Sequence, residues 1–156
     1  MKKKVYVETT IFSFYYDARP AAEITARRNW TRLWWDKHRS KYDVVTSTAV
    51  LVELERGSLP HRQQALDLAL TLPAISVAEE IADIVSVYVE HRVMPRDPAG
   101  DALHLALASV EKCDYLITWN CEHLANANKF GHIRRVNAML GLHVPLLVTP
   151  LELGEL

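Results

Sequence analysis

The chain has 156 residues, of which 49% are hydrophobic and 24% are charged, and its formal net charge is −1 at pH 7. This length suits a single domain, and the composition is close to the globular average, which excludes a disordered or fibrous chain. The nearly balanced charge favours no nucleic-acid, membrane or acidic partner in particular.

Five short segments are predicted to be β-strands because they are β-branched and almost continuously apolar. In chain order they cover residues 5–7, 43–46, 74–77 (the weakest), 115–118 and 144–148. Segments with helical periodicity lie between them, at residues 22–39, 63–72, 78–91, 101–112 and 130–140, and one more helix begins at Ser47 and ends at Gly57. This alternation predicts one α/β domain over residues 1–156, with a central, mainly parallel sheet of four or five strands flanked by helices.

Acidic residues follow the first two predicted strands. Glu8 comes directly after residues 5–7 and precedes Thr9 and Thr10, and Glu53 borders the apolar stripe of the helix after the second strand. Taken alone, a helix start explains Glu8 and a solvated helix acid explains Glu53. Their position is nevertheless notable, because sites in such sheets lie beyond the carboxyl ends of the strands.

Two further polar positions follow in the later part of the chain. Asp101 begins the predicted helix 101–112 after a loop over residues 95–100, and an N-cap role explains it. His104 lies one turn further on the same face, where we expect a packed, hydrogen-bonded side chain rather than a ligand. Asn120 follows the strand over residues 115–118 and is a common turn residue.

The joint placement of these residues carries more weight than any one of them. Glu8, Glu53, Asp101 and Asn120 are expected to converge at one end of the sheet, and all four offer oxygen ligands. Hard oxygen ligands select Mg²⁺ or Mn²⁺ over zinc. Carboxylates crowded together without a cation would repel one another, so the cluster predicts a metal site made by Glu8, Glu53 and Asp101.

Four segments together resemble the motifs of one protein family, the PIN domain, and within it the short VapC-type ribonuclease toxins of toxin–antitoxin pairs. They are residues 5–11 (VYVETTI), Glu53 with Leu54 and Gly57, residues 101–106 (DALHLA), and residues 116–120 (LITWN) followed by 123–126 (HLAN). The tail, with Val144-Pro145 and residues 148–152, is similar to one PIN subgroup, so the resemblance runs nearly end to end.

This resemblance implies a three-layer α/β domain and a metal-dependent endoribonuclease that uses Mg²⁺, with Mn²⁺ as a substitute. It also implies a cytoplasmic toxin that frequently forms a homodimer and is inhibited by an antitoxin protein. Residue by residue, Glu8, Glu53 and Asp101 take the acidic positions and Asn120 takes the fourth catalytic position. Thr9 and Thr118, with His104, are expected to support the site. Asp101 or Glu8 would orient the attacking water, and the products would carry 5′-phosphate and 3′-hydroxyl ends.

Two departures from the family pattern favour an alternative function. The first acidic position usually carries Asp, and the extra methylene of Glu8 moves the carboxylate by roughly 1 Å or more. The fourth position is often acidic, whereas Asn120 is neutral; Glu122 nearby is a weaker candidate to replace it. The alternative is a catalytically weak or inactive PIN-like module that binds RNA or a protein partner.

A basic, tryptophan-rich segment is the candidate surface for RNA or a partner. Residues 22–41 hold six basic and two acidic residues, a local charge of +4, and residues 129–135 add three basic residues and no acid. Arg27, Arg28, Arg32 and Trp35 are the predicted surface residues. Trp30 and Trp34, four residues apart on the apolar stripe, are expected to pack in the interior or in a dimer contact.

Other classes of protein fit the sequence less well. A phosphoacceptor receiver domain needs an aspartate after a strand and a lysine after a later one, whereas Glu8 is a poor phosphoacceptor and no lysine follows Thr118 or Thr149. No Gly-rich turn follows the first strand, which disfavours a dinucleotide-binding enzyme. The chain begins MKKKVYVE, without an apolar signal-peptide core, and its two cysteines lack the spacing of a zinc site; both features favour a cytoplasmic protein without a membrane partner.

Overall fold

Five strands form one sheet in the computed structural model, which describes residues 1–94 and 100–154. The strands are β1 (Lys4–Val7), β2 (Asp43–Ser47), β3 (Ala74–Ile75), β4 (Tyr115–Ile117) and β5 (Leu146–Val148), in the spatial order β3-β2-β1-β4-β5. Each pair of neighbours runs parallel. The predicted α/β fold with a parallel sheet is therefore confirmed.

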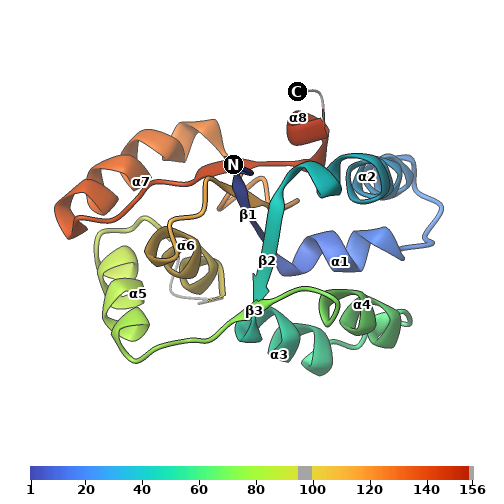
Figure 1. The fold of residues 1–156 in the computed structure, drawn as a ribbon, viewed down its shortest axis with the longest axis horizontal. Helices are drawn as coiled ribbons and strands as arrows, with labels where there is room; N and C mark the ends of the chain where they lie inside the picture. The colour runs from blue at the N-terminus through green and yellow to red at the C-terminus, as the bar shows by residue number, and fades with distance from the viewer. Residues whose placement is uncertain (95–99, 155–156) are drawn as a thin grey trace.

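Helices cover both sides of the sheet (Figure 1). They are α1 (Thr9–Tyr15), α2 (Ala22–Leu33), α3 (Thr48–Arg56), α4 (Arg62–Ala69), α5 (Glu80–Glu90), α6 (Gly100–Val110), α7 (Ala127–Leu140) and α8 (Pro150–Gly154). Figure 1 shows α1, α2 and α4 to one side of β1 and β2, and α5, α6 and α7 to the other. Right-handed crossovers explain this arrangement, because the chain moves across the sheet in one direction up to β3 and in the other from β3 to β5.

The strand order reverses at β1, which lies between β2 and β4. At such a reversal the loops that leave two adjacent strands diverge, and they leave a crevice beyond the carboxyl ends of those strands. The two strand ends stay side by side, since the Glu8 amide donates a hydrogen bond to the Ile117 carbonyl over 3.1 Å. Residues that follow β1 and β4 therefore face the same crevice.

The central strand is the most deeply buried part of the sheet. Val5, Tyr6 and Val7 have no exposed surface, because helices cover both faces of β1. The apolar faces of α1 and α6 pack onto this core, with Ile11 and Phe12 from α1 and eight buried residues from α6. No helix within the described residues combines the length and the apolar character needed to cross a membrane.

The predicted helix over residues 22–39 changes its winding partway. After α2 the chain forms a π-helix, Trp34–His38, and a 3₁₀ turn, Arg39–Lys41. Trp35 packs against α1, so this side chain is only 6% exposed and its ring lies 5.7 Å from that of Phe12. The prediction that Trp35 is an exposed partner-binding residue is wrong for this reason.

The other two tryptophans of this segment differ in how deeply they are buried. Trp34 is fully buried, as expected for the apolar stripe. Trp30 is 37% exposed and stacks on Trp119 with ring centres 6.1 Å apart, so it covers the edge of the core rather than lying inside it.

Helix boundaries differ from the predictions in smaller ways. Glu8 is the N-cap of α1, and Asp101 is the second residue of α6 rather than its N-cap. The predicted loop covers residues 95–100; Gly100 is instead the first residue of α6, and residues 95–99 lie outside the described residues. The short helix α8 has no counterpart among the predicted elements, because five residues are too few to show a periodic pattern.

Candidate active site

Glu8 lies at the end of β1 as a buried carboxylate. Its Oε1 accepts hydrogen bonds from the Thr10 amide (3.1 Å), the Thr10 hydroxyl and the Thr118 hydroxyl (2.6 Å). Burial raises the pKa of Glu8, and the nearby His104 charge and the threonine hydrogen bonds oppose this rise only in part. The side chain thus caps α1 and is held against the loop that follows β4.

The side chain of Glu53 extends from α3 into the crevice, where it contacts α6 through His104 and α1 through Thr9. Its Oε1 lies 2.6 Å from His104 Nε2, and its Oε2 accepts a hydrogen bond of 2.9 Å from the Thr9 hydroxyl. Burial raises the pKa of Glu53, but the hydrogen bonds and the charge of His104 outweigh it, so the pKa is lowered. Gly100 passes so close that a Cβ there would lie 3.2 Å from Glu53 Oε1.

His104 is a buried connector between Glu53 and the central strand. Its Nδ1 lies 2.7 Å from the hydroxyl of Tyr6, which lies 2.7 Å from the hydroxyl of Ser47. Burial lowers the pKa of His104, but the hydrogen bond to Glu53 and the charges of Glu53, Glu8 and Asp101 together raise it. The expectation of a packed, hydrogen-bonded histidine is confirmed, and three carboxylates act on its ring.

Asp101 and Asn120 form a second contact in the crevice, between the start of α6 and the loop after β4. The Asn120 Nδ2 donates a hydrogen bond of 3.0 Å to Asp101 Oδ2, and the Asn120 Oδ1 accepts one from the His123 amide. Burial raises the pKa of Asp101, against the lowering effects of His123, Asn120 and His104. Asn120 therefore links the loop after β4 to the first turn of α6 and fixes one oxygen of the Asp101 carboxylate.

The structure brings the predicted residues into a site network of two hydrogen-bonded groups, one of Thr9, Glu53 and His104 and one of Glu8, Thr118, Asn120 and Asp101. Hydrogen bonds join Thr118 to Glu8, Thr9 to Glu53, and Asn120 to Asp101. By contrast, Glu122 has a side chain that is 83% exposed and lies 3.8 Å from His123 rather than in the network.

Two members of the network were not identified from the sequence. Thr10 binds Glu8 and also accepts a hydrogen bond from the Trp119 amide, and its position beside Thr9 was the available signal. Tyr6 lies in the middle of a buried strand, where a phenol resembles any other core side chain.

The chemistry of these donors fits a divalent cation. Among the described residues, the ion pairs of Glu8, Glu53 and Asp101 include no lysine or arginine, and His104 is the one ion-pair partner, to Glu53. Three carboxylates thus face one imidazole, a surplus of negative charge that hard cations relieve. With the side chains as they lie, the described part of the chain holds no group of three His, Cys, Asp or Glu residues close enough to bind a metal ion.

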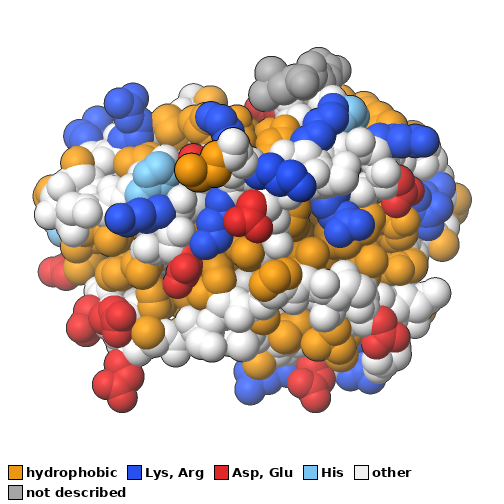
Figure 2. Space-filling view, in the orientation of Figure 1, with side chains coloured by type: hydrophobic (Ala, Val, Ile, Leu, Met, Phe, Trp, Pro, Cys, Tyr) orange, Lys and Arg blue, Asp and Glu red, His pale blue; other side chains and the backbone are white. Residues whose placement is uncertain are grey.

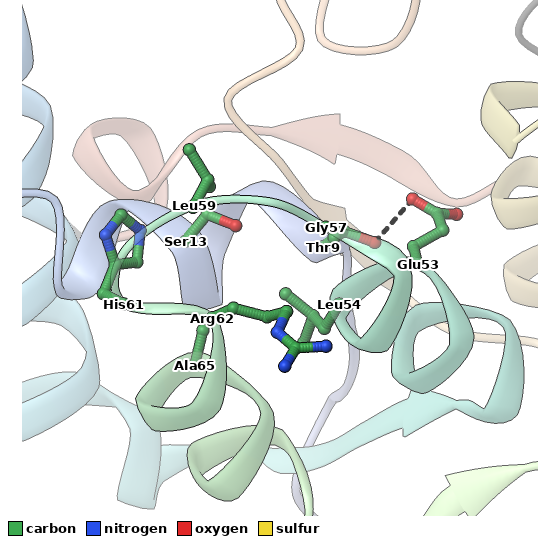
Figure 3. A pocket seen from close by; sticks show the side chains of 9 residues that line it. All are labelled: Thr9, Ser13, Glu53, Leu54, Gly57, Leu59, His61, Arg62 and Ala65. Atoms are coloured by element: carbon green, nitrogen blue, oxygen red, sulfur yellow. Dashed lines mark hydrogen bonds between the residues drawn. The ribbon is translucent and has the colours of Figure 1, made fainter.

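A small cavity of about 180 Å³ opens beside Glu53, between α1, α3 and α4. Figure 3 shows the Thr9–Glu53 hydrogen bond at one end of this cavity and His61 at the other, with Arg62 along one wall. The candidate site therefore continues into a hollow on the α1–α4 side of the sheet.

The predicted basic surface is partly occupied by internal contacts. Arg27 pairs with Glu23 over 3.1 Å and lies over the Trp119 ring, and Arg28 Nη1 donates to the Asp17 carbonyl. Arg32 is exposed, but its Nε donates to the Tyr15 carbonyl. Figure 2 shows lysine and arginine side chains over the upper half of the molecule, where α2 and α7 lie, and acidic side chains at the lower left around α5.

Comparisons with known proteins agree with this geometry. A family model described as "PIN domain" matches residues 5–127, a range that includes Glu8, Glu53, Asp101 and Asn120. A chain of the crystal structure of VapBC2 from Rickettsia felis bound to a DNA fragment from their promoter has a similar fold, with a TM-score of 0.55 and 17% sequence identity. The similarity covers 94% of this chain and 98% of that one. No curated protein matches the chain.

Proposed function

The chain belongs to the PIN domain family, and we propose that it is a metal-dependent endoribonuclease that hydrolyses RNA phosphodiester bonds. One observation carries this proposal: at the reversal of the strand order, His104 contacts Glu53 at 2.6 Å and lies near enough to Glu8 and Asp101 for their charges to raise its pKa. A crevice at this point is where open α/β sheets bind their ligands. An excess of carboxylates in a partly buried site is unfavourable unless a cation completes it.

Glu8, Glu53 and Asp101 would hold Mg²⁺, with Mn²⁺ as a substitute. When bound, such an ion polarises a phosphate and lowers the pKa of a coordinated water. The protein's own contribution is to position the carboxylates: Thr10 and Thr118 hold Glu8, His104 and Thr9 hold Glu53, and Asn120 holds Asp101. Asp101 or Glu8 would then orient the attacking water, with 5′-phosphate and 3′-hydroxyl products.

We further propose that the protein is the toxin of a toxin–antitoxin pair, acts in the cytoplasm and forms a homodimer. The fold shared with a chain of VapBC2 supports a protein partner of the antitoxin kind. Arg27, Arg28 and Arg32 are the candidate surface for RNA or for that partner. The guanidinium nitrogens that do not take part in their internal contacts would make the contacts with it.

A second function is favoured by the present position of Glu53. Both of its oxygens already have partners, His104 and Thr9, and the described residues form no closed ligand group. A PIN-like module that binds RNA or a protein without cutting would have these features. The two functions differ in whether the protein binds a metal ion and cleaves RNA.

The test is cleavage of structured and single-stranded RNA by the purified protein in EDTA, Mg²⁺ and Mn²⁺. We expect cutting only with metal, and a loss of at least about 100-fold in Asp101→Asn, the size expected when a group that positions the attacking water is removed. Asp67→Asn, an exposed carboxylate on α4, is the matched control and should cut normally. Cutting that persists in Asp101→Asn, or products with 2′,3′-cyclic phosphate ends, would contradict the proposed site.

A further inference from the structure

The cavity beside Glu53 has a volume and an apolar lining that suit one ring system. Leu54, Leu59 and Ala65 form its apolar part. Its volume of about 180 Å³ is below the roughly 300–1,000 Å³ of pockets that enclose whole drug-sized ligands. It is therefore suited to one group of a larger molecule that also reaches the carboxylates.

Polar residues also line this cavity. His61 stands at the start of α4, and its Nε2 is buried without a hydrogen-bond partner among the described residues. A buried nitrogen of this kind is costly to leave unpaired, which indicates that a ligand or water completes it. The Ser13 hydroxyl and the Arg62 guanidinium line the same cavity and add two donors (Figure 3).

A second, more open cavity continues from the first. It has a volume of about 480 Å³, and Leu59 and His61 line both. From there it extends to Tyr16 and Arg19 at the end of α1. His61 thus lies between a small pocket next to Glu53 and a wider hollow whose wall holds the Tyr16 ring and the ion pair of Arg19 with Asp17.

We propose that the small cavity binds the base of a single-stranded RNA nucleotide next to the cleaved phosphate, and that His61 hydrogen-bonds to the edge of this base. The strand then continues over the second cavity, where Tyr16 offers a stacking surface. This inference rests on the proposed function, because it places the reacting phosphate at Glu53. Sequence-specific RNA recognition commonly works in this way, with unstacked bases inserted into pockets and read by their polar edges.

Binding can be tested without cleavage, which separates this inference from the nuclease itself. The four nucleoside 5′-monophosphates are titrated into ¹⁵N-labelled full-length Asp101→Asn protein in EDTA. We expect the amide signals of Ser13, His61 and Ala65 to shift, and one or two of the bases to bind more tightly than the others. Replacing His61 with alanine in the same protein should weaken the binding of the preferred nucleotide about tenfold, as loss of one hydrogen bond predicts. It should also reduce the differences in affinity between the four bases.

Variants of the cavity wall complete the test. Ala65→Leu fills the cavity and should abolish the shifts, and Ser13→Val serves the same purpose if Ala65→Leu, at a residue that is 1% exposed, fails to fold. Gln63→Ala is the matched control on the same helix, because Gln63 hydrogen-bonds to Asp67 and does not line the cavity.

Cleavage of a pool of random RNA supplies the second readout. His61→Ala should broaden the base preference beside the cut while metal-dependent cutting persists. If the wild type cuts RNA but no nucleotide shifts the cavity amides, this inference is wrong and the nuclease stands. If nucleotides shift these amides but no metal supports cutting, the base pocket stands and the nuclease fails.

Discussion

The imidazole of His104 connects the candidate site to the core of the molecule. One ring nitrogen contacts Glu53 at 2.6 Å and the other contacts the Tyr6 hydroxyl at 2.7 Å. The Tyr6 hydroxyl also contacts Ser47, the cap of α3, so the chain of contacts begins and ends on the helix that carries Glu53. Such a buried network fixes its members only while every polar group is satisfied.

Removal of the His104 ring should therefore destabilise the fold and leave the side chains of the site less firmly positioned. We expect His104→Ala to lower the free energy of unfolding by about 2–4 kcal/mol, because it opens a cavity and leaves Tyr6 and Glu53 without their partner. Guanidinium denaturation measures this change. His143→Ala, at an exposed histidine, should change the free energy by less than about 0.5 kcal/mol. Equal effects of the two variants would contradict the connecting role of His104.

Asp17 is a buried carboxylate outside the group of Glu8, Glu53 and Asp101. Both of its oxygens accept hydrogen bonds from the Arg19 guanidinium, with the closest contact at 2.6 Å from Nη2. These hydrogen bonds lower the pKa of Asp17 more than burial raises it. The ionised carboxylate is therefore the form that stabilises the fold.

This shift predicts how stability depends on pH. The folded pKa lies below the unfolded value of about 3.9, so the stabilising contribution is present above that value and is lost as the pH falls through the folded pKa. Asp17→Asn should be less stable than the wild type at neutral pH, and the difference should shrink below about pH 4. Thermal unfolding across pH measures this, with the exposed Glu55→Gln as the control. If the stability difference between the wild type and Asp17→Asn grew as the pH fell, the pKa of Asp17 would not be lowered in the folded protein.

At the scale of single elements, helix α7 has one glycine in its interior, with helical backbone, and is followed by a second glycine with a left-handed backbone. Gly141 ends the helix with a φ of 68°, in the left-handed region, whereas a Cβ added to Gly131, inside the helix, would meet no atom within 4 Å. We expect Gly141→Ala to destabilise the protein by about 1–2 kcal/mol and Gly131→Ala to stabilise it by about 0.5–1 kcal/mol. Chemical denaturation of the two variants measures both signs. Equal effects would contradict the assigned end of α7.

Elements were predictable wherever one local signal dominated. Strands β1 and β2 are short, β-branched and bounded by polar residues, and both appear where expected. The capped start of α3 at Ser47 is likewise readable from the residue type. Trp35 lies off the apolar stripe, which predicts an exposed side chain, but α1 packs against it, and local sequence carries no information about that contact.

The sequence was enough to choose the candidate site residues, but it did not predict the contacts between their side chains. The strand-end rule identified Glu8 and Asn120, because only the order of strands and helices is needed to apply it. The pairing of Glu53 with His104 depends on how α3 and α6 pack, as does the position of Tyr6 behind the ring. Contacts of this kind join residues 51 and 98 positions apart, and local sequence carries no information about them.

At the scale of the whole molecule, a bound metal ion should stabilise the folded state. A ligand that binds only the folded chain adds about 2.7 kcal/mol at 100 times its Kd. We therefore expect Mn²⁺ to raise the melting temperature of the wild type as its concentration rises, and to have little effect on Asp101→Asn. Asp67→Asn should respond like the wild type. The absence of any shift at millimolar Mn²⁺ would favour the binding-module function.

The central strand β1 also sets the order in which the molecule can be completed during synthesis. It pairs with β4 through Val5 and Tyr115, and Thr118 reaches Glu8 across 110 positions of the chain. A nascent chain that stops before β4 already carries Glu8, Glu53 and Asp101, but it lacks Asn120 and the threonine that hold two of them. Pairing over such a distance forms late, because closing a long loop is slow. Incomplete translation products of this protein are therefore expected to lack the assembled carboxylate site, which is completed only once the last quarter of the chain has left the ribosome.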